Sequence, residues 1–272
     1  MNTKIFLLSL GCPRNLVDSE VLTGLLKEEG FTFEDDARKA DLFILNTCAF
    51  IDSAKKESID TILELAALKK ERLEEKIPLI VTGCLSQRYP NALLKEIPEI
   101  DGIFGSSDFI KIPQFIKGML DKNKAKRIHE NAPCVTKKPH FLYNHRLARD
   151  FITPRHYAYV KLQEGCRNHC SYCLIPTLRG PYRSRTLDSV VKEVIQLRKK
   201  GVQEINLIGQ DITLYGIDRY RSVRLVSLLK KLAEIMKDGW IRLLYTHPAH
   251  YSDELIEIIS GEKPICKYLD IP

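Results

Sequence analysis

Three cysteines in the middle of the chain have the spacing of a metal-binding loop. Cys166, Cys170 and Cys173 form a C-x3-C-x2-C pattern directly after an apolar run at residues 157–162. Three closely spaced thiolates can ligate three corners of a cubane iron–sulfur cluster. The fourth iron then has no protein ligand, and an open position on a metal is typical of a catalytic site. The alternative is a zinc knuckle with His169 as the fourth ligand.

Three further cysteines occupy equivalent positions in the first third of the chain. Cys12, Cys48 and Cys84 each follow the end of an apolar run, at intervals of 36 residues. Ligands of open parallel sheets lie at the carboxyl ends of the strands, and neighbouring strands are ~4.8 Å apart. These thiols are therefore predicted to converge on a second cluster; the alternative is three small buried cysteines. We expect Cys134 to be a free thiol and Cys266 to be a core residue.

The elements that must position the thiols alternate between strand and helix. Before residue 122, apolar runs predict strands at 5–10, 41–46, 78–82 and 103–104, with helices after Cys12, at 53–75 and up to Leu120. Strands that alternate with helices indicate an α/β fold, here an open parallel sheet covered on both faces. We predict an N-terminal domain at 1–122 and a basic linker at 123–154.

The second half predicts another series of β/α units, at 155–272. The expected strands are 157–162, 204–208, 240–245 and 267–271, and the expected helices are 188–200, 222–237 and 252–260. Parallel units of this kind indicate a β/α barrel. About four strands do not close a barrel, so we expect a partial barrel that is truncated or completed by a partner.

Composition and charge narrow the class of protein. The apolar share is 44%, no apolar run approaches the ~20 residues of a membrane span, and no secretion signal is evident. We therefore expect a cytoplasmic protein with no membrane partner, in which clustered cysteines indicate metal or redox chemistry. The net charge is +7, and ten Lys and Arg residues lie between Lys111 and Arg149. This basic segment suits a ribosomal or nucleic-acid partner, and a solvated linker explains it equally well.

The central cysteine loop resembles the signature of the radical S-adenosylmethionine (SAM) enzymes. The resemblance implies that the amino and carboxylate groups of SAM chelate the free iron. Reduction of the cluster then splits SAM into methionine and a deoxyadenosyl radical. The residues that this resemblance and the chemistry of guanidinium groups suggest for cofactor binding are Tyr172, Arg183, Arg185, Gly209, Gln210 and Asp211. A polar loop at 209–211 and a solvated basic loop at 183–185 are the alternatives.

The first three cysteines resemble those of the methylthiotransferases, whose N-terminal α/β domain binds a second cluster. Segments 9–20, 46–55 and 81–85 resemble the RimO branch, which modifies an aspartate of a small-subunit ribosomal protein. The resemblance extends to the second half, at 164–166, 179–185 and 207–211. It implies methylthiolation of the aspartate β-carbon with two 4Fe–4S clusters, SAM, and external electron and sulfur donors.

Two other functions remain open on the sequence. A tRNA methylthiotransferase that acts on a modified adenosine also suits the basic linker. A non-catalytic iron–sulfur or metal-binding protein would carry clusters without cleaving SAM. Members of the resembled family continue into further barrel strands and a C-terminal β-barrel that grips the substrate, and this sequence does not include them.

Overall fold

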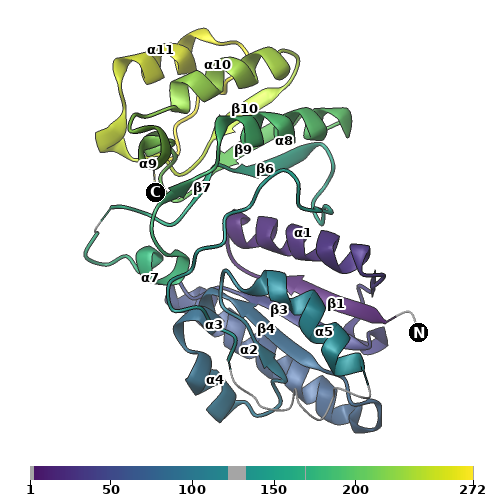
Figure 1. The fold of residues 1–272 in the computed structure, drawn as a ribbon. Helices are drawn as coiled ribbons and strands as arrows, with labels where there is room; N and C mark the ends of the chain where they lie inside the picture. The colour runs from purple at the N-terminus through teal and green to yellow at the C-terminus, as the bar shows by residue number, and fades with distance from the viewer. Residues whose placement is uncertain (1–2, 122–132, 169, 272) are drawn as a thin grey trace. The chain divides into compact units, whose positions relative to one another are not determined.

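The chain forms two compact units in the computed structural model, which describes residues 3–121, 133–168 and 170–271 (Figure 1). Unit 1 comprises residues 1–140, 148–150 and 177–179. Unit 2 comprises residues 141–147, 151–176 and 180–272. Two short segments of the second half of the chain therefore belong to unit 1. The predicted linker at 123–154 is shared between the units, and its residues 123–132 lie outside the described part of the chain.

Unit 1 is built on a parallel sheet of five strands in the order β2-β1-β3-β4-β5. The strands are β1 (Lys4–Ser9), β2 (Thr32–Phe33), β3 (Leu42–Thr47), β4 (Leu79–Gly83) and β5 (Gly102–Ile103). Every residue of β3 and β4 is buried, as expected for parallel strands covered on both faces. Ser9 pairs with Asn46, and Asn46 pairs with Thr82. The central strands β1, β3 and β4 therefore end at the same level of the sheet.

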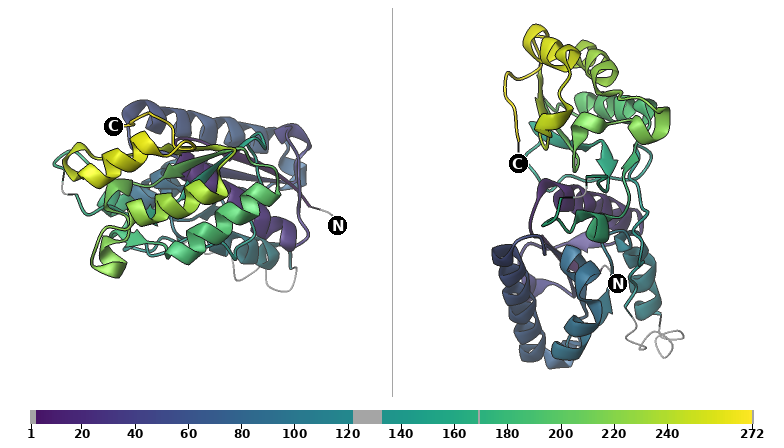
Figure 2. Two further views of the ribbon diagram at one scale, coloured as in Figure 1. Left: turned by 90° about the horizontal axis from the view of Figure 1, so that it is seen from above. Right: turned by 90° about the vertical axis from the view of Figure 1, so that its left-hand side faces the viewer.

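The helices of unit 1 cover both faces of this sheet (Figure 2). They are α1 (Pro13–Glu28), α2 (Asp52–Glu71), α3 (Cys84–Arg88), α4 (Pro90–Glu96) and α5 (Ile112–Leu120), with 3-10 turns at Ala37–Lys39, Leu73–Glu75 and Phe109–Lys111. The chain leaves β1 toward β2 but leaves β3 toward β4, in the opposite direction along the sheet. Because such crossovers are right-handed, α1 and α2 lie on opposite faces. The space between β1 and β3 is thus a topological switch point.

Part of the predicted linker extends the edge of the sheet. Cys134 forms a parallel bridge with Phe104, and its N–H donates to Ile103 O at 2.8 Å. The Asp108 carboxylate is 1% exposed, and it accepts hydrogen bonds from Thr136 N and Oγ1 at 2.8 and 2.7 Å. The Cys134 thiol is free, as predicted. These bonds give the segment a defined position that its polar sequence did not indicate.

Unit 2 contains a parallel sheet of three strands in the order β10-β9-β6 and a two-stranded antiparallel sheet. The strands are β6 (Tyr157–Lys161), β7 (Gln163–Glu164), β8 (Arg183–Ser184), β9 (Glu204–Ile208) and β10 (Trp240–Leu243). The helices are α7 (Ile175–Arg179), α8 (Leu187–Lys199), α9 (Ile217–Tyr220), α10 (Leu225–Ile235) and α11 (Asp253–Gly261), with 3-10 turns at Ile212–Leu214 and Pro248–His250. Apolar faces of α8, α10 and α11 pack on the parallel sheet around Val160, Leu207 and Ile241.

The predicted strand at 267–271 is wrong. A single bridge joins Ile265 to Ile241, and no strand follows it. β10 ends at Leu243, and Tyr245 then has a φ of +62°, so the chain leaves the extended path that a partner would need. Asp270 instead accepts hydrogen bonds from Tyr245 N and Thr246 N. Cys266 is half-buried rather than a core residue.

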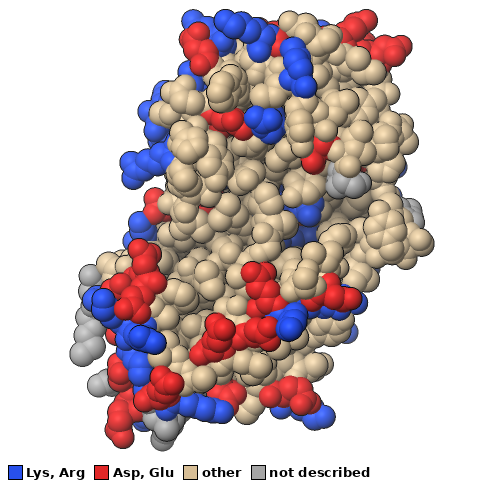
Figure 3. Space-filling view, turned by 180° about the vertical axis from the view of Figure 1, so that it is seen from behind, with Lys and Arg blue, Asp and Glu red and all other residues tan. Residues whose placement is uncertain are grey.

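Surface charges in unit 1 are mixed in sign. On the face drawn in Figure 3, Lys and Arg alternate with Asp and Glu over the lower part of the view. Unit 1 also contains ion pairs at its surface, such as Lys70–Glu99 and Lys27–Asp150. Within the described residues, no helix combines the length and the apolar character that crossing a membrane requires.

Candidate metal centres

The three N-terminal cysteines lie at the carboxyl ends of three adjacent strands. Cys12, Cys48 and Cys84 follow β1, β3 and β4, which are neighbours in the sheet. This edge includes the switch point, where open α/β sheets bind their ligands. The loop before Cys12 runs directly against Cys48, because a Cβ on Gly11 would lie 3.0 Å from Cys48 Sγ. Adjacent strand ends therefore bring the three thiols to the same edge of the sheet.

The Asn15 side chain contacts all three thiol-bearing segments. Its Nδ2 donates to Leu10 O at 3.1 Å and to Thr47 O at 2.9 Å, next to Cys12 and Cys48. Its Oδ1 lies 3.8 Å from Cys84 Sγ. Asn15 is fully buried at the start of α1. One amide thus holds the three loops in register, a role that only the tertiary structure reveals.

The loops that carry Cys48 and Cys84 are fixed by backbone contacts. The Ser58 hydroxyl bonds to both the N–H and the carbonyl oxygen of Cys48, each at 3.0 Å. Gly83 has a φ of +101°, and a Cβ there would lie 2.4 Å from Asn46 Oδ1. Only glycine fits this tight turn from β4 into α3. The positions of both thiols are therefore determined by the fold before any ligand binds.

Cationic side chains surround the N-terminal thiols. Burial opposes ionisation of Cys12, but the positive charges of Arg14 and Arg179, with hydrogen bonds, lower its pKa to about 7. Burial raises the pKa of Cys84, and the negative charges of Cys12 and Cys48 raise it further. This electrostatic effect accords with the placement of the three thiols at the ends of adjacent strands. Ligation by a cationic metal cluster would remove the cost of ionising Cys84.

A single-ion site and an iron–sulfur cluster differ in how closely their thiolates must converge. A zinc site holds all its sulfurs about 2.3 Å from one point. Within the described residues, no group of three or more His, Cys, Asp or Glu side chains is placed to hold one metal ion. A cluster instead spreads its thiolates over separate irons. His169, the proposed fourth ligand of a zinc knuckle, lies outside the described residues.

The central cysteines lie on a loop of unit 2 between β7 and α7. Cys166, Cys170 and Cys173 are all partly exposed. The Asn168 N–H points at Cys166 Sγ at 3.4 Å, and Cys173 N donates to Cys170 O at 3.1 Å. Burial and the nearby negative charge of Asp211 raise the pKa of Cys166. The loop therefore places its thiols at the surface of the unit, where a metal and a small molecule have access.

Asp211 is hydrogen-bonded to the loop that carries the central cysteines. Its carboxylate is buried and lies just beyond β9. Oδ2 accepts from Asn168 Nδ2 at 2.9 Å and contacts His250 Nδ1 at the same distance. Oδ1 accepts from Thr213 N at 3.1 Å. Asp211 was predicted to lie near SAM, and both its oxygens bond to side chains or backbone of the same unit. Sequence reasoning missed Asn168 and His250, because their link to Asp211 is long-range.

Gly209 and Gln210 share this strand end, as the spacing predicted. A Cβ on Gly209 would lie 2.7 Å from Gln163 Nε2, so the loop passes close to β7. Gln163 Nε2 also donates to Asp211 O at 2.9 Å. Tyr172, in contrast, is 79% exposed and projects from the loop into solvent. The loop after β9 is thus packed into unit 2, whereas the exposed ring of Tyr172 is accessible to a ligand.

The two predicted arginines have different environments. Arg185 is 2% exposed, and its guanidinium lies 2.5 Å from the carboxylate of Glu193. Its guanidinium therefore binds a carboxylate, but that carboxylate belongs to Glu193 of α8. Arg183 donates to the carbonyl oxygens of Pro181 and Phe141, and burial lowers its pKa. Of the two, Arg183 is the more exposed.

A buried ion pair that the sequence did not indicate lies at the end of β6. Lys161 Nζ is 2.5 Å from Glu164 Oε1, and neither side chain is more than 4% exposed. Lys161 follows an apolar strand pattern, so nothing in the sequence separates it from a solvated terminal lysine. Buried charges persist only when they are paired. The pair thus places two charged groups at the carboxyl ends of β6 and β7, directly before the loop that carries the central cysteines.

Comparison with known proteins identifies both halves of the chain. Residues 4–105 match the model of uncharacterized protein family UPF0004, and residues 160–272 match that of the radical SAM superfamily. "Ribosomal protein uS12 methylthiotransferase RimO" of Caldicellulosiruptor saccharolyticus is 45% identical over 269 residues, which cover 99% of this chain and 59% of that protein. The protein of the same name from Geotalea uraniireducens is 48% identical over 275 residues, or 99% and 58%. This chain is therefore similar over nearly its whole length to relatives named RimO.

A solved structure shares the fold of this chain. The radical SAM methyltransferase TsrM from Kitasatospora setae, solved with tryptophan and a SAM analogue, superposes with a TM-score of 0.60 at 16% identity. The match covers 96% of this chain and 57% of that one. At this identity the likeness concerns the fold alone. The chain spans about three-fifths of the length of the RimO-type relatives that it matches.

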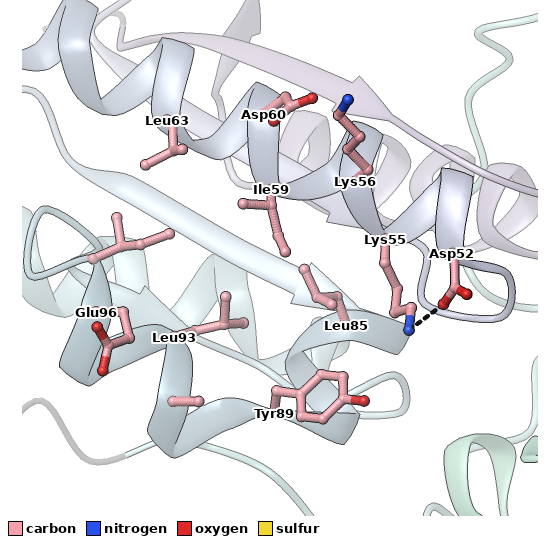
Figure 4. Close-up of a pocket in the computed structure, with 12 residues that line it drawn as sticks. Asp52, Lys55, Lys56, Ile59, Asp60, Leu63, Leu85, Tyr89, Leu93 and Glu96 are labelled. Carbon is pink, nitrogen blue, oxygen red and sulfur yellow. Dashed lines mark ion pairs between the residues drawn. The ribbon is translucent and has the colours of Figure 1, made fainter.

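One pocket of unit 1 lies outside both cysteine clusters. Its volume is about 700 Å³. In Figure 4, Ile59 and Leu63 of α2 face Leu85 and Leu93 of α3 and α4 across it. Its lining comprises Asp52, Lys55, Lys56, Ile59, Asp60, Leu63, Leu85, Tyr89, Ala92, Leu93, Glu96 and Ile97. None of the six predicted ligand cysteines lines it. It is therefore an apolar groove of unit 1 that is separate from the thiols.

Proposed function

We propose that this protein is an enzyme that adds a methylthio group to the β-carbon of an aspartate in a small-subunit ribosomal protein. The observation that carries the proposal is the placement of Cys12, Cys48 and Cys84 on adjacent strand ends at the switch point of unit 1. A second cluster site is what distinguishes a sulfur-inserting enzyme from a simple radical enzyme. The printed names of the RimO-type relatives support the ribosomal substrate.

The six cysteines divide into two proposed sites. Cys166, Cys170 and Cys173 would hold the cluster that binds SAM, and the three N-terminal cysteines would hold the other. When bound, the first cluster supplies an electron that cleaves SAM to a hydrogen-abstracting radical, and the second carries the sulfur. A methylene hydrogen of aspartate is not acidic enough for ordinary base catalysis, so radical chemistry suits this substrate.

The protein's own side chains prepare these sites. Asp211, with Asn168 and His250, fixes the base of the loop that carries the central thiols. Tyr172, Gly209 and Gln210 are proposed to contact SAM beside that loop. Arg183 is proposed to meet a carboxylate, whereas Arg185 is fully engaged with Glu193 and is proposed to act only through the packing of β8.

The proposal includes partners and a compartment. A reductant and a sulfur donor must come from outside, because each turnover consumes electrons and a sulfur atom that the side chains do not replace. A second SAM provides the methyl group. We place the reaction in the cytoplasm, where thiols remain reduced. We also propose that residues 1–122 and 155–272 act as the two functional domains, joined by 123–154.

The deciding experiment is anaerobic reconstitution of the protein with iron and sulfide, followed by incubation with SAM, a one-electron reductant and either the small-subunit ribosomal protein or tRNA. We expect deoxyadenosine in the product mixture and a ribosomal protein whose aspartate has gained one methylthio group by mass spectrometry. C166A/C170A/C173A abolishes both products. C12A/C48A/C84A abolishes the modification but retains deoxyadenosine. A modified tRNA adenosine with an unmodified ribosomal protein would instead establish the tRNA function. Clusters without deoxyadenosine would establish a non-catalytic iron–sulfur protein.

A further inference from the structure

A buried arginine from the second half of the sequence lies beside the N-terminal thiols. Arg179 is 4% exposed, and its Nη1 is 2.5 Å from Asp18 Oδ2. Its Nη2 donates to Asn15 Oδ1, the same oxygen that lies 3.8 Å from Cys84 Sγ. The guanidinium, the amide and the thiol thus form one continuous set of contacts. Arg179 also acts electrostatically on Cys12.

The segment that carries Arg179 is docked into unit 1. Residues 177–179 belong to this unit, although the chain on either side belongs to unit 2. Leu178 is fully buried, and its carbonyl oxygen accepts a hydrogen bond from Ser106 Oγ. Asp18 and Asn15, which contact the guanidinium, both come from α1. Arg179 is therefore a fixed part of the thiol site.

A fixed positive charge matters at this place. Cys48 and Cys84 are buried and Cys12 is partly buried, so thiolates at these positions would concentrate negative charge where water screens it poorly, and unpaired buried charge is costly. Arginine stays protonated under all physiological conditions, so its charge does not depend on the state of the thiols. The reduction potential of an iron–sulfur cluster depends on nearby charge, on hydrogen bonds to its sulfurs and on burial. Asp18, paired to the same guanidinium, acts in the opposite direction.

We propose that Arg179 is a positioning residue that seats the cluster held by Cys12, Cys48 and Cys84 and raises its reduction potential, and that Asp18 moderates this effect. The inference rests on the proposed function, because it requires a cluster at these cysteines. It adds a residue from the second half of the chain, six positions after Cys173, to the N-terminal site. The arginine proposed to adjust the reduction potential of the N-terminal cluster thus follows closely, in sequence, the cysteines proposed to bind the SAM cluster.

The test uses the protein with Cys166, Cys170 and Cys173 replaced by alanine, so that only the N-terminal cluster is observed. In this background, Arg179→Gln, Arg179→Lys and Asp18→Asn are compared. The measurements are iron and sulfide per chain, the electron paramagnetic resonance spectrum of the reduced cluster, and an anaerobic redox titration. Arg149→Gln is the matched control, because Arg149 is equally buried and pairs with Glu20 of the same helix at 2.6 Å.

We expect Arg179→Gln to lower the potential by at least about 59 mV, a tenfold change in the ratio of reduced to oxidised cluster. Asp18→Asn raises the potential, and Arg179→Lys restores more than half of the loss. Arg149→Gln shifts only the melting temperature. If Arg179→Gln loses its iron while the folded control keeps it, the seating role is supported.

Two results would overturn the inference. One is an unchanged potential in both Arg179→Gln and Asp18→Asn. The other is equal loss of iron from Arg179→Gln and from Arg149→Gln, which would indicate general destabilisation. Failure of the proposed function looks different: the background protein itself, with Arg179 intact, would then hold no iron. A purely structural arginine would not shift the potential in opposite directions when it and its partner are changed in turn.

Discussion

At the scale of single residues, side chains and glycines fix where the thiols stand. Asn15 bonds to the ends of two ligand-bearing loops and faces the third thiol. Gly83 adopts a backbone conformation that residues with a Cβ rarely adopt, directly before Cys84. Neither role requires chemistry of its own. Both residues act by removing alternative positions for the cysteines, so their replacement should change stability as well as metal binding.

Two glycine substitutions separate backbone strain from steric conflict. Gly83→Ala forces a Cβ to within 2.4 Å of Asn46 Oδ1 at a φ of +101°. Gly30→Ala has a φ of +86° with open space around it. We expect Gly30→Ala to cost about 1–2 kcal/mol, the price of a left-handed non-glycine residue, and Gly83→Ala to cost clearly more. Urea unfolding of both variants measures the difference. Equal losses would show that the turn before Cys84 has room for a side chain.

The residues of the two sites were predicted to different extents. The six cysteines were predicted as ligands from their spacing after apolar runs and from the resemblance, and this role stays a prediction. Arg179 and His250 were not assigned, since their contacts join distant positions: Arg179 bonds to Asn15 across 164 residues. Arg185 was predicted as a ligand-binding residue because a basic loop gives no indication of its buried partner Glu193.

At the scale of elements, the proposed metal sites of both units lie at the ends of strands. β1, β3 and β4 end beside the N-terminal thiols, and β9 ends beside Asp211. The sequence predicted these strands because continuous apolar runs mark strands buried on both faces. The parallel sheet is confirmed. The strand at 267–271 was wrong, because apolar content cannot show that β10 ends before it could serve as a partner.

The end of β9 should stabilise the central cysteine loop. Asp211→Ala removes the acceptor of Asn168 and His250. We expect the loop to lose its fixed geometry and the iron content of a C12A/C48A/C84A background to fall several-fold. Asp238→Ala, at an exposed aspartate before β10, should leave iron binding unchanged. Full iron occupancy in Asp211→Ala would mean that the cysteines alone define the loop.

The docked segment at the edge of β5 depends on one buried carboxylate. Asp108→Ala deletes the acceptor of two hydrogen bonds from Thr136 and of one ion pair from Lys111 at 2.6 Å. We expect a loss of about 2–4 kcal/mol, since bonds to charged groups contribute about 1.5–3 each and the change leaves buried donors unpaired. Hydrogen exchange should accelerate at the amides of Gly105 and Cys134. Asp52→Ala, at a carboxylate that is 95% exposed, should change stability by less than about 0.5 kcal/mol.

At the scale of the whole molecule, each unit has a sheet, a core and a set of thiols of its own. The two-unit division is visible in the sequence as two series of β/α elements. The sequence did not show that residues 148–150 and 177–179 return to unit 1. Such returns are held by long-range contacts, among them the buried pairs Glu20–Arg149 and Asp18–Arg179, and these contacts leave no periodic pattern.

Removal of iron should therefore destabilise one unit at a time. A ligand that binds only the folded state contributes about 2.7 kcal/mol at a hundredfold excess over its Kd. In the C166A/C170A/C173A protein, we expect chelation of iron to accelerate hydrogen exchange in β3 and β4 of unit 1 and to leave β9 of unit 2 unchanged. The C12A/C48A/C84A protein should show no change in β3 and β4. Equal acceleration in both sheets would show that the units unfold together.

The return of residues 177–179 to unit 1 has a consequence for biosynthesis. Chains are made from the N-terminus, and domains generally fold as they emerge. The five-stranded sheet is complete once β5 has been made, yet Arg179 follows 76 residues after Ile103. During that interval the nascent sheet carries Cys12, Cys48 and Cys84 before Arg179 can pair with Asp18. The surroundings of the N-terminal thiols are therefore complete only after the central cysteine loop has been translated, and a cluster at the proposed N-terminal site would reach its final electrostatic environment only then.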